Sequence, residues 1–285
     1  MGAGFPPRPA PAKDIASAQF RPSGQEDLAP SGAASRVRAN IAALATLRTI
    51  QAEVRPATPE EQRVLARWSG WGAVPEVFDS ARSEFAQARH ELGELLSSEE
   101  LKAAARNTLN AHYTDAAIVE AVWSAVREPG FTGGRVLEPG CGSGNFIGLP
   151  PAAAELTGVE LDPVTAAIAA LLYPQAEIRA ESFADTRERD GCFDLVIGNV
   201  PLGKVVLHRV HNAAGHSIHN HFVVKSVRLA RPGGLVACLT SRYTMDSRNP
   251  AARREIASLA DLPGRSGWRA GHTSGQRARA WSPIC

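Results

Sequence analysis

The chain has 285 residues, of which 44% are hydrophobic, and this suits one large domain with its own core plus shorter attachments. No apolar run approaches the length of a membrane span, and the N-terminus lacks the apolar stretch of a secretory signal, so we expect a cytoplasmic protein without a membrane partner. The four cysteines are scattered, which favours reduced thiols over a zinc site or a disulfide framework. A net charge of +2 neither demands nor excludes nucleic acid as a partner.

The first 109 residues divide into two parts. Residues 1–34 are rich in Pro, Ala, Gly and Ser, and we expect them to be disordered. Residues 35–109 have helical periodicity, with one apolar stripe that recurs at steps of three and four: Val37, Ile41, Leu44, Leu47, Ile50 and Val54. A second helix should begin after Thr58, where Glu61 completes a capping box, and end at Trp68. This small helical region must pack on another part of the chain.

Residues 110–262 alternate between strand and helix patterns. Short apolar strands are expected at residues 135–139, 156–162, 176–180, 193–198 and 235–240. Helices are expected at residues 116–126, 163–173 and 219–229. Asp115 and Asp162 can cap the first two, and residues 231–234, which read RPGG, should stop the third. This alternation predicts a parallel sheet with helices on both faces, which is a doubly wound α/β fold.

A glycine-rich turn follows the first of these strands, in the stretch VLEPGCGSGNF at residues 136–146. Glycines at Gly140 and Gly142 let the backbone turn sharply and approach a ligand closely. A dinucleotide fingerprint would require a third glycine where Asn145 stands, so the sequence argues against a nicotinamide cofactor. An ordinary tight turn between strand and helix is the alternative.

Polar residues end the next two strands. Glu160 lies about 20 residues beyond the glycine-rich turn, where an acidic side chain can accept hydrogen bonds from both hydroxyls of a ribose. Its alternative is a solvated carboxylate at a strand end. After the third strand, Ser182 and Phe183 stand where an adenine ring could be bonded at its edge and packed on its face, although Phe183 could equally belong to the core.

These elements, in this order, resemble the class I methyltransferases that depend on S-adenosyl-L-methionine. The resemblance covers residues 110–245 and implies a Rossmann-like sheet and that cofactor. It implies cofactor contacts from Glu138, Pro139, Gly140, Gly142, Gly144, Glu160, Ser182 and Phe183. Upstream, HYTD at residues 112–115 is similar to the YTP-like segment of DNA amino-methyltransferases with the same circular order. That similarity implies that Tyr113 or Thr114 lies near the methionine end of the cofactor, with Asp115 departing from the pattern.

The fourth strand runs into NVPL, at residues 199–202. The family has Asn-Pro-Pro-aromatic here; the Asn oxygen and a backbone carbonyl accept the two N–H bonds of an amino group, while the aromatic stacks on a flipped base. The resemblance therefore implies that Asn199 and the carbonyl of Val200, which precedes Pro201, hold the amine. Leu202 replaces the aromatic, and stacking is worth about 1–3 kcal/mol, so we predict weak activity unless another aromatic such as Phe222 supplies the platform. A strand end with a plain turn is the alternative.

A long loop and several histidines follow Asn199. We expect this loop to contact DNA through Lys204, Arg209 and its imidazoles. His219 and His221 are two residues apart on a predicted helix, so they face different sides, and we predict no metal site.

Both ends of the chain carry further expectations. RPATPEEQRVLARWSGWGAVPEVFD, followed by TLNAHYTD, resembles the start of large bacterial proteins of mobile elements that join an adenine methylase to a helicase, so a helicase region is expected as a missing partner. A methyltransferase sheet normally has seven strands; we expect five here, a sixth beginning at residues 259–262, and a sheet incomplete at its C-terminal edge. Residues 263–285 read as a basic, disordered tail, either foreign to the fold after a frameshift or premature stop, or a contact for nucleic acid.

The predicted activity is methyl transfer from S-adenosyl-L-methionine to an exocyclic amino group, with adenine N6 in DNA as the first choice of substrate. Two alternatives stay open. One is an RNA or protein-glutamine amino-methyltransferase, because these enzymes use the same Asn-Pro-Pro-aromatic motif to hold the amine. The other is a non-catalytic remnant of a methylase–helicase that still binds the cofactor.

Overall fold

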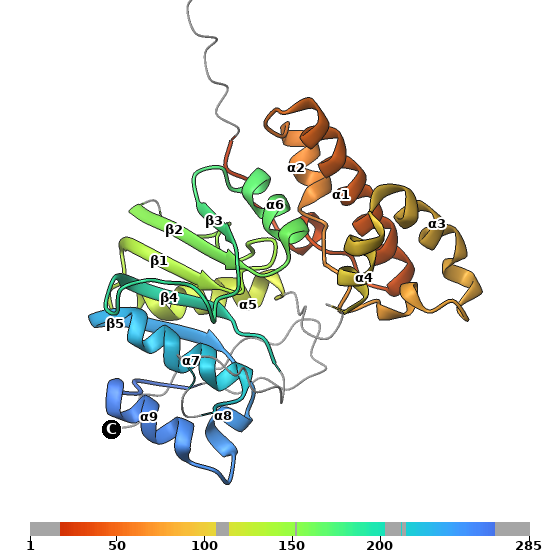
Figure 1. Cartoon of the computed structure of the whole chain (residues 1–285). Helices are drawn as coiled ribbons and strands as arrows, with labels where there is room; N and C mark the ends of the chain where they lie inside the picture. Colours follow the sequence, from red (N-terminus) through yellow and green to blue (C-terminus); the bar gives the residue numbers. More distant parts are fainter. Residues whose placement is uncertain (1–17, 107–113, 152, 203–211, 213–214, 266–285) are drawn as a thin grey trace, which may run out of the picture.

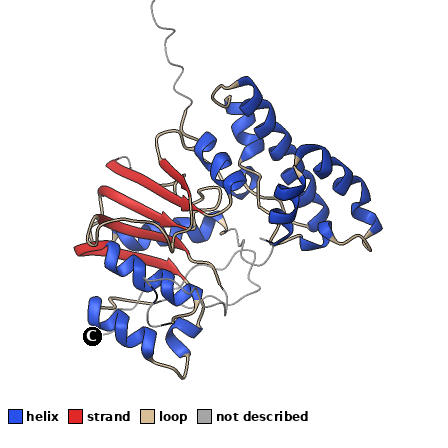
Figure 2. Ribbon diagram, viewed as in Figure 1, coloured by secondary structure: helices blue, strands red, loops and turns tan. Residues whose placement is uncertain are grey.

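The computed structural model describes residues 18–106, 114–151, 153–202, 212 and 215–265. Its centre is a parallel sheet of five strands in the order β3-β2-β1-β4-β5 (Figures 1 and 2). The strands are β1 (Gly133–Pro139), β2 (Ala153–Glu160), β3 (Glu177–Ala180), β4 (Phe193–Asn199) and β5 (Ala230–Leu239). The doubly wound α/β prediction is confirmed.

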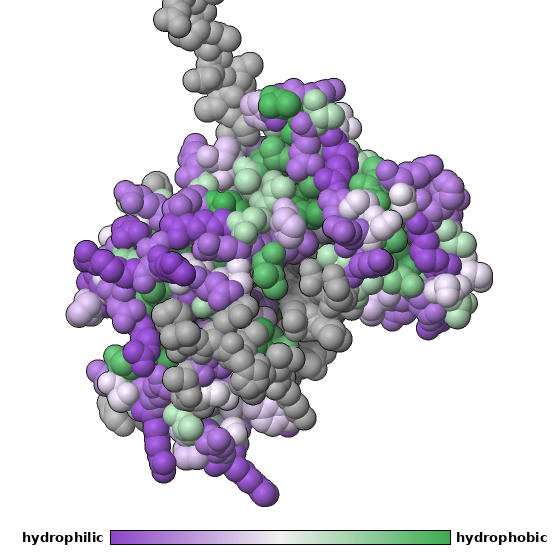
Figure 3. Space-filling model, in the orientation of Figure 1, coloured by the Kyte–Doolittle hydropathy of each residue, from purple (hydrophilic) through white to green (hydrophobic). Residues whose placement is uncertain are grey.

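Helices cover both faces of the sheet because its strands are apolar on both sides. Val136 and Leu195 pack with α5 (Ala116–Arg127) in one hydrophobic cluster. Leu137, the next residue along β1, packs with α7 (Ile218–Leu229) in another. Successive residues of a strand point to opposite faces, so a buried parallel strand reads as a continuous apolar run. The surface in Figure 3 is largely hydrophilic.

Side-chain caps begin three of the helices as expected. Asp115 accepts a hydrogen bond from the Ala117 amide at the start of α5. Asp162 accepts one from the Thr165 amide at the start of α6 (Pro163–Leu172). Thr58 and Glu61 form both bonds of a capping box at the start of α2 (Pro59–Leu65), which ends three residues before the predicted Trp68.

The helical region packs on the side of the sheet that carries α6 (Figure 1). Its α-helices are α1 (Ala33–Glu53), α2, α3 (Ala86–Leu95) and α4 (Ser98–Arg106), and its short 3-10 turns are η1 (Gln25–Asp27), η2 (Pro75–Phe78) and η3 (Ser83–Phe85). Leu44 and Trp68 share one hydrophobic cluster with Ile168 and Leu172 of α6. The helical region therefore lies against the helix that follows β2.

Two expectations for the N-terminal part are corrected. Residues 18–34 belong to the folded structure, because Phe20 and Leu28 are buried and the Phe20 amide donates to the Leu172 carbonyl oxygen at 2.9 Å. Residues 1–17 lie outside the described residues. Val54, placed in the buried stripe, is 89% exposed, because α1 ends there in the left-handed conformation with φ of 49°.

Two further expectations fail near the C-terminal edge of the sheet. The helix α7 ends at Leu229 as predicted, but residues 231–234 belong to β5, which begins at Ala230 instead of residue 235 and has a register shift opposite Phe193 and Leu195. Gly233 takes a φ of 73° there, which accommodates the irregularity. After α8 (Tyr243–Asp246), α9 (Ala251–Leu259) occupies the start of the expected sixth strand, and residues 260–265 form no strand. Within the described ranges, no helix has the length and apolar character needed to cross a bilayer.

Candidate cofactor and amine site

The site lies where the strand order reverses. β1 pairs with β2 on one side and with β4 on the other, so the connections from β1 and from β4 leave in opposite directions. In open α/β sheets this arrangement leaves a crevice beyond the carboxyl ends of the two central strands. Gly140 follows β1 directly and Asn199 ends β4, so the two motifs singled out in the sequence meet at this crevice.

The glycine-rich turn is held against the end of β2. The amides of Gly140 and Cys141 both donate to the Val159 carbonyl oxygen, at 2.8 and 3.0 Å. Gly140 takes a φ of 69°, and a β-carbon added to it would come no closer than 3.6 Å to its neighbours. A β-carbon on Gly144 would instead lie 2.6 Å from the Tyr173 ring. A β-carbon on Gly140 would thus only touch Phe222 and Pro201, whereas Gly144 allows close packing against a buried aromatic.

A cavity of about 290 Å³ occupies the crevice. Most of the residues proposed from sequence line it: Thr114, Glu138, Gly140, Gly142, Glu160, Ser182, Phe183, Asn199, Val200 and Pro201. Pro139, Gly144 and Leu202 are not among its lining residues, and Tyr113 lies outside the described part of the chain. The fold therefore brings the glycine-rich turn, the acid of β2 and the NVPL segment to one cavity, while the roles of the individual residues stay predictions.

Glu160 is oriented by backbone amides on both of its oxygens. Gly142 donates to Oε2 at 2.9 Å and Asp162 donates to Oε1 at 2.8 Å. Burial raises the pKa of this carboxyl, and the two amide bonds oppose that rise. Each carboxylate oxygen can accept more than one hydrogen bond, so both can also receive hydroxyl groups from a ligand in the cavity.

Glu138 is the most deeply buried acid of the cavity, at 4% exposure. The amides of Phe146 and Ile147 bond to the carboxyl, but Oε2 has no hydrogen-bond partner among the described residues. Burial raises its pKa well above the ordinary value, despite the opposing amide bonds. A buried carboxylate without a full set of partners is costly, so this position suits a ligand that brings positive charge or hydrogen-bond donors.

Thr114 joins three sequence motifs. Its side-chain Oγ1 accepts a hydrogen bond from Asn199 Nδ2 at 3.2 Å, and its carbonyl oxygen accepts one from Asn145 Nδ2 at 3.0 Å. The upstream HYTD segment, the glycine-rich turn and NVPL are therefore tied together at one residue. The bond from Asn199 also fixes which way its side-chain amide is turned. In the sequence, Asn145 only argues against a dinucleotide fingerprint, and no local pattern predicts its bond to the Thr114 carbonyl oxygen.

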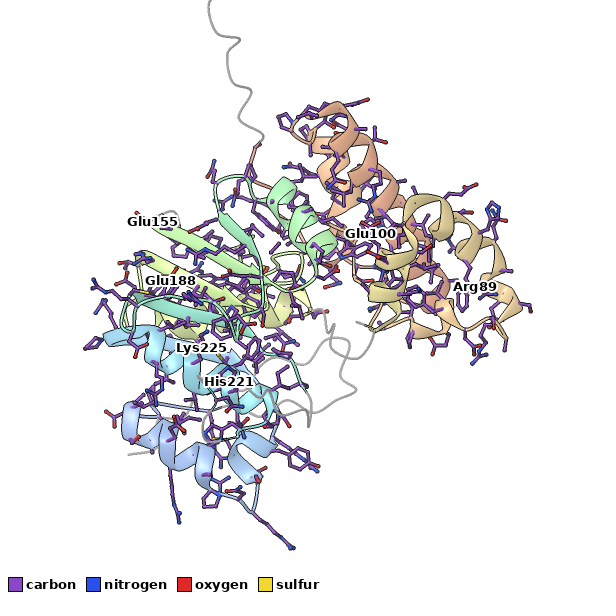
Figure 4. All side chains as sticks on the ribbon, viewed as in Figure 1. Arg89, Glu100, Glu155, Glu188, His221 and Lys225 are labelled. Carbon is purple, nitrogen blue, oxygen red and sulfur yellow. The ribbon has the colours of Figure 1, made fainter. Side chains whose placement is uncertain are left out.

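Two phenylalanines form the wall near Ser182. The rings of Phe183 and Phe222 lie 4.8 Å apart, and both line the cavity. Lys225, on α7 beside the sheet (Figure 4), donates to the carbonyl oxygens of Phe183, Ala184 and Thr186. Its Nζ lies 4.8 Å from the Phe183 ring, and burial lowers its pKa. Lys225 therefore holds the loop that carries Phe183, a role that no sequence pattern signalled.

The histidines and cysteines of the described residues do not form a metal site. No group of three or more His, Cys, Asp or Glu side chains there could hold a metal ion. His216 lies 2.7 Å from Glu255, which also bonds Arg228; Arg228 and then His216 lower the pKa of Glu255. Lys204 and Arg209, expected to contact DNA, lie outside the described residues.

Comparison with protein families adds an independent observation. Residues 137–238 match the family model described as a methyltransferase domain. The matched stretch begins in β1 and ends in β5, so it contains the glycine-rich turn, Glu160 and Asn199.

One curated protein has a sequence related to part of this chain. The chain is 26% identical over 147 residues to the Defense against restriction protein B of Escherichia phage P1. That match covers 50% of this chain but 6% of the phage protein, so the chain spans only a small part of its relative's length.

Solved structures with a similar fold include a class I S-adenosylmethionine-dependent methyltransferase candidate from Listeria monocytogenes, at 15% identity and a TM-score of 0.43, covering 79% of this chain and 78% of that one. An RNA methyltransferase candidate from Pyrococcus horikoshii has 17% identity and a TM-score of 0.35, covering 53% of this chain and 69% of that one. At this level of similarity, neither structure indicates a substrate.

The match to a methyltransferase domain implies S-adenosyl-L-methionine as the cofactor, and the residues that line the cavity are chemically suited to it. Glu160 would accept its ribose hydroxyls, and the backbone of Gly140 and Gly142 borders the same cavity. Glu138, which also lines the cavity, would lie near its positively charged end. Ser182 and Phe183 stand at the wall where the adenine would lie.

Proposed function

We propose that this chain transfers a methyl group from S-adenosyl-L-methionine to an exocyclic amino group, and that the substrate is adenine N6 in DNA. One observation carries the proposal: Asn199, Val200 and Pro201 line the same cavity as the cofactor residues. The amine acceptor and the cofactor would therefore share one space. When bound, the cofactor supplies an electrophilic methyl group on its sulfonium.

Holding the amine is the contribution of the chain itself. An adenine amino group is a poor nucleophile because its lone pair is delocalised into the ring. The Oδ1 of Asn199 and the carbonyl of Val200 would accept its two N–H bonds, which positions the nitrogen and favours its rehybridisation. Thr114 orients the Asn199 amide, and the Val200 amide donates to the Leu239 carbonyl oxygen at 3.0 Å, which anchors the segment to β5.

A flipped base also needs an apolar surface on which to rest. Leu202 is half-buried and is not among the cavity-lining residues, whereas Phe222 lines the cavity and lies near Gly140 and Pro201. We therefore assign the platform to Phe222. The phage relative is named for defence against restriction, and methylation of DNA is one chemistry that would serve such a role. In that setting the chain would act beside a helicase region.

The test is transfer of labelled methyl groups from the cofactor to DNA, RNA and protein offered in parallel, followed by identification of the methylated product. The expected product is N6-methyladenine in DNA, and Asn199→Ala should abolish it while leaving cofactor binding unchanged. Transfer to RNA or protein glutamine instead would redirect the substrate assignment. Cofactor binding with no transfer to any of the three would favour the second candidate, a non-catalytic module in which Leu202 has replaced a necessary aromatic.

A further inference from the structure

The helical region contributes a turn to the wall of the cavity. Residues 66–74 connect α2 to η2, and Gly70 takes a φ of 59° within them. Asn40 of α1, which is fully buried, accepts a hydrogen bond from the Ser69 amide and donates to the Gly70 carbonyl oxygen. A buried amide that satisfies two backbone groups fixes this turn in one conformation.

The turn presents two tryptophans to the methyltransferase fold. Trp68 and Trp71 lie edge to face at 5.5 Å, and both line the cavity. Trp71 also packs against Phe78 at 5.5 Å, and is 6% exposed. Glu100, on α4 (Figure 4), lines the same cavity. The wall opposite the sheet is thus built by a region outside the matched domain.

Two hydrogen bonds lead from this turn to the Asp162 side chain, and a third joins the backbone of Asp162 to Glu160. Trp68 Nε1 donates to Thr165 Oγ1 at 3.0 Å, and that hydroxyl donates to Asp162 Oδ2 at 2.6 Å. The Asp162 amide then donates to Glu160 Oε1 at 2.8 Å. The third bond ends on one of the two oxygens that would receive the ribose hydroxyls.

We infer that the helical region is part of the cofactor site: Trp68 positions Glu160 through Thr165 and Asp162, and Trp71 contacts the bound cofactor. The inference rests on the proposed cofactor site. It gives the N-terminal helices a function in binding, beyond packing on α6. Because the wall they form belongs to another region, cofactor affinity depends on residues that a minimal methyltransferase fold would not contain.

Calorimetric titration of the full chain with S-adenosyl-L-methionine tests whether Trp68 positions Glu160 through Thr165 and Asp162, a connection called the relay below. Trp68→Phe removes the indole donor and should weaken binding roughly 3- to 10-fold, the effect of one neutral hydrogen bond. The matched control is Gln62→Leu, which also removes a bond between the helical region and α6, to the Leu171 carbonyl oxygen, but at the other end of that helix. It should leave the dissociation constant within a factor of about two.

Thr165→Val provides a milder break at the centre of the relay and serves if Trp68→Phe fails to fold. The double variant Trp68→Phe/Thr165→Val should bind the cofactor no more weakly than the weaker single variant, because both remove the same coupling. If the losses of cofactor affinity in the two single variants add up in the double variant, the two side chains do not act through one relay. Wild-type affinity in Thr165→Val would reject the relay by itself.

Fluorescence tests the contact with Trp71 separately. Saturating cofactor should change the tryptophan emission of the wild-type chain, and Trp71→Phe should remove most of that change while Trp68→Phe keeps it. An unchanged response in Trp71→Phe would exclude the contact. If the wild-type chain binds no cofactor at all, the cofactor assignment itself fails; if it binds and the variants match it, only the present inference fails.

Discussion

Replacing Glu138 with glutamine should raise stability and lower cofactor affinity at the same time. The carboxyl is 4% exposed, and its Oε2 has no partner among the described residues. Glutamine keeps the shape and an acceptor for the amides of Phe146 and Ile147, but it removes the charge. Without cofactor, the variant therefore avoids the cost of burying a carboxylate charge and is more stable. With cofactor, the positively charged ligand has lost its ionic partner and binds more weakly.

The pH dependence follows from the direction of the pKa change. Folding raises the pKa of Glu138 well above its ordinary value of 4.5, so the folded state holds a proton that the unfolded state has released. Wild-type stability therefore falls as pH rises above that ordinary value, until the folded-state pKa is passed. Each unit by which folding raises a carboxyl pKa costs about 1.4 kcal/mol after ionisation. We expect Glu138→Gln to be more stable near neutral pH, because a buried polar group without a partner costs about 1–3 kcal/mol, which corresponds to roughly 3–10 °C in Tm.

Thermal unfolding between pH 4 and pH 8, with and without cofactor, measures both effects. Without cofactor the advantage of Glu138→Gln should grow with pH. With saturating cofactor the advantage of Glu138→Gln should shrink by about 1.4–2.8 kcal/mol, because loss of a charged hydrogen bond weakens binding roughly 10- to 100-fold. A variant that is no more stable than wild type, or whose advantage does not depend on pH, would refute the reasoning about this carboxyl.

Four other substitutions test neighbouring parts of the site. Lys225→Met leaves three carbonyl oxygens without their donor and should lower the free energy of unfolding by about 1–3 kcal/mol in urea titration; an unchanged midpoint would contradict that role. Gly144→Ala should lower Tm by steric conflict with Tyr173, and a normal Tm with lost cofactor binding would instead favour a direct cofactor role. Phe222→Leu should reduce kcat/KM for DNA about 10- to 100-fold, whereas Leu202→Phe should leave it nearly unchanged because Leu202 does not line the cavity; an increase in Leu202→Phe would place the platform at position 202 instead.

The strand and glycine pattern was sufficient to predict the fold and the position of the cavity. Parallel strands buried on both faces leave continuous apolar runs, and Asp115 and Asp162 mark helix starts by a local bond, so both features can be read from sequence. The ends of parallel strands meet at one edge, which is why Gly140, Glu160 and Asn199 could be assigned to one site in advance.

The missed features depend on contacts between distant segments. Residues 231–234 follow the end of α7 as expected, but their Pro and Gly residues do not suggest a strand, and only pairing with β4 and the Arg231 bond to Asp194 place them in β5. Residues 18–34 have the composition of a disordered segment, yet burial of Phe20 orders them. The bonds of Lys225 and Trp68 join residues 39 or more positions apart, and no local pattern encodes such pairs.

Calorimetric titration of the purified chain with S-adenosyl-L-methionine, beside Glu160→Ala, is the most direct test of the central claim that this cavity is a methyltransferase cofactor site. The account predicts binding by the wild-type chain and at least a roughly 10-fold loss in Glu160→Ala, because the carboxylate would accept both ribose hydroxyls. A folded wild-type chain that binds no cofactor, or a Glu160→Ala variant that binds it equally well, would contradict the assignment.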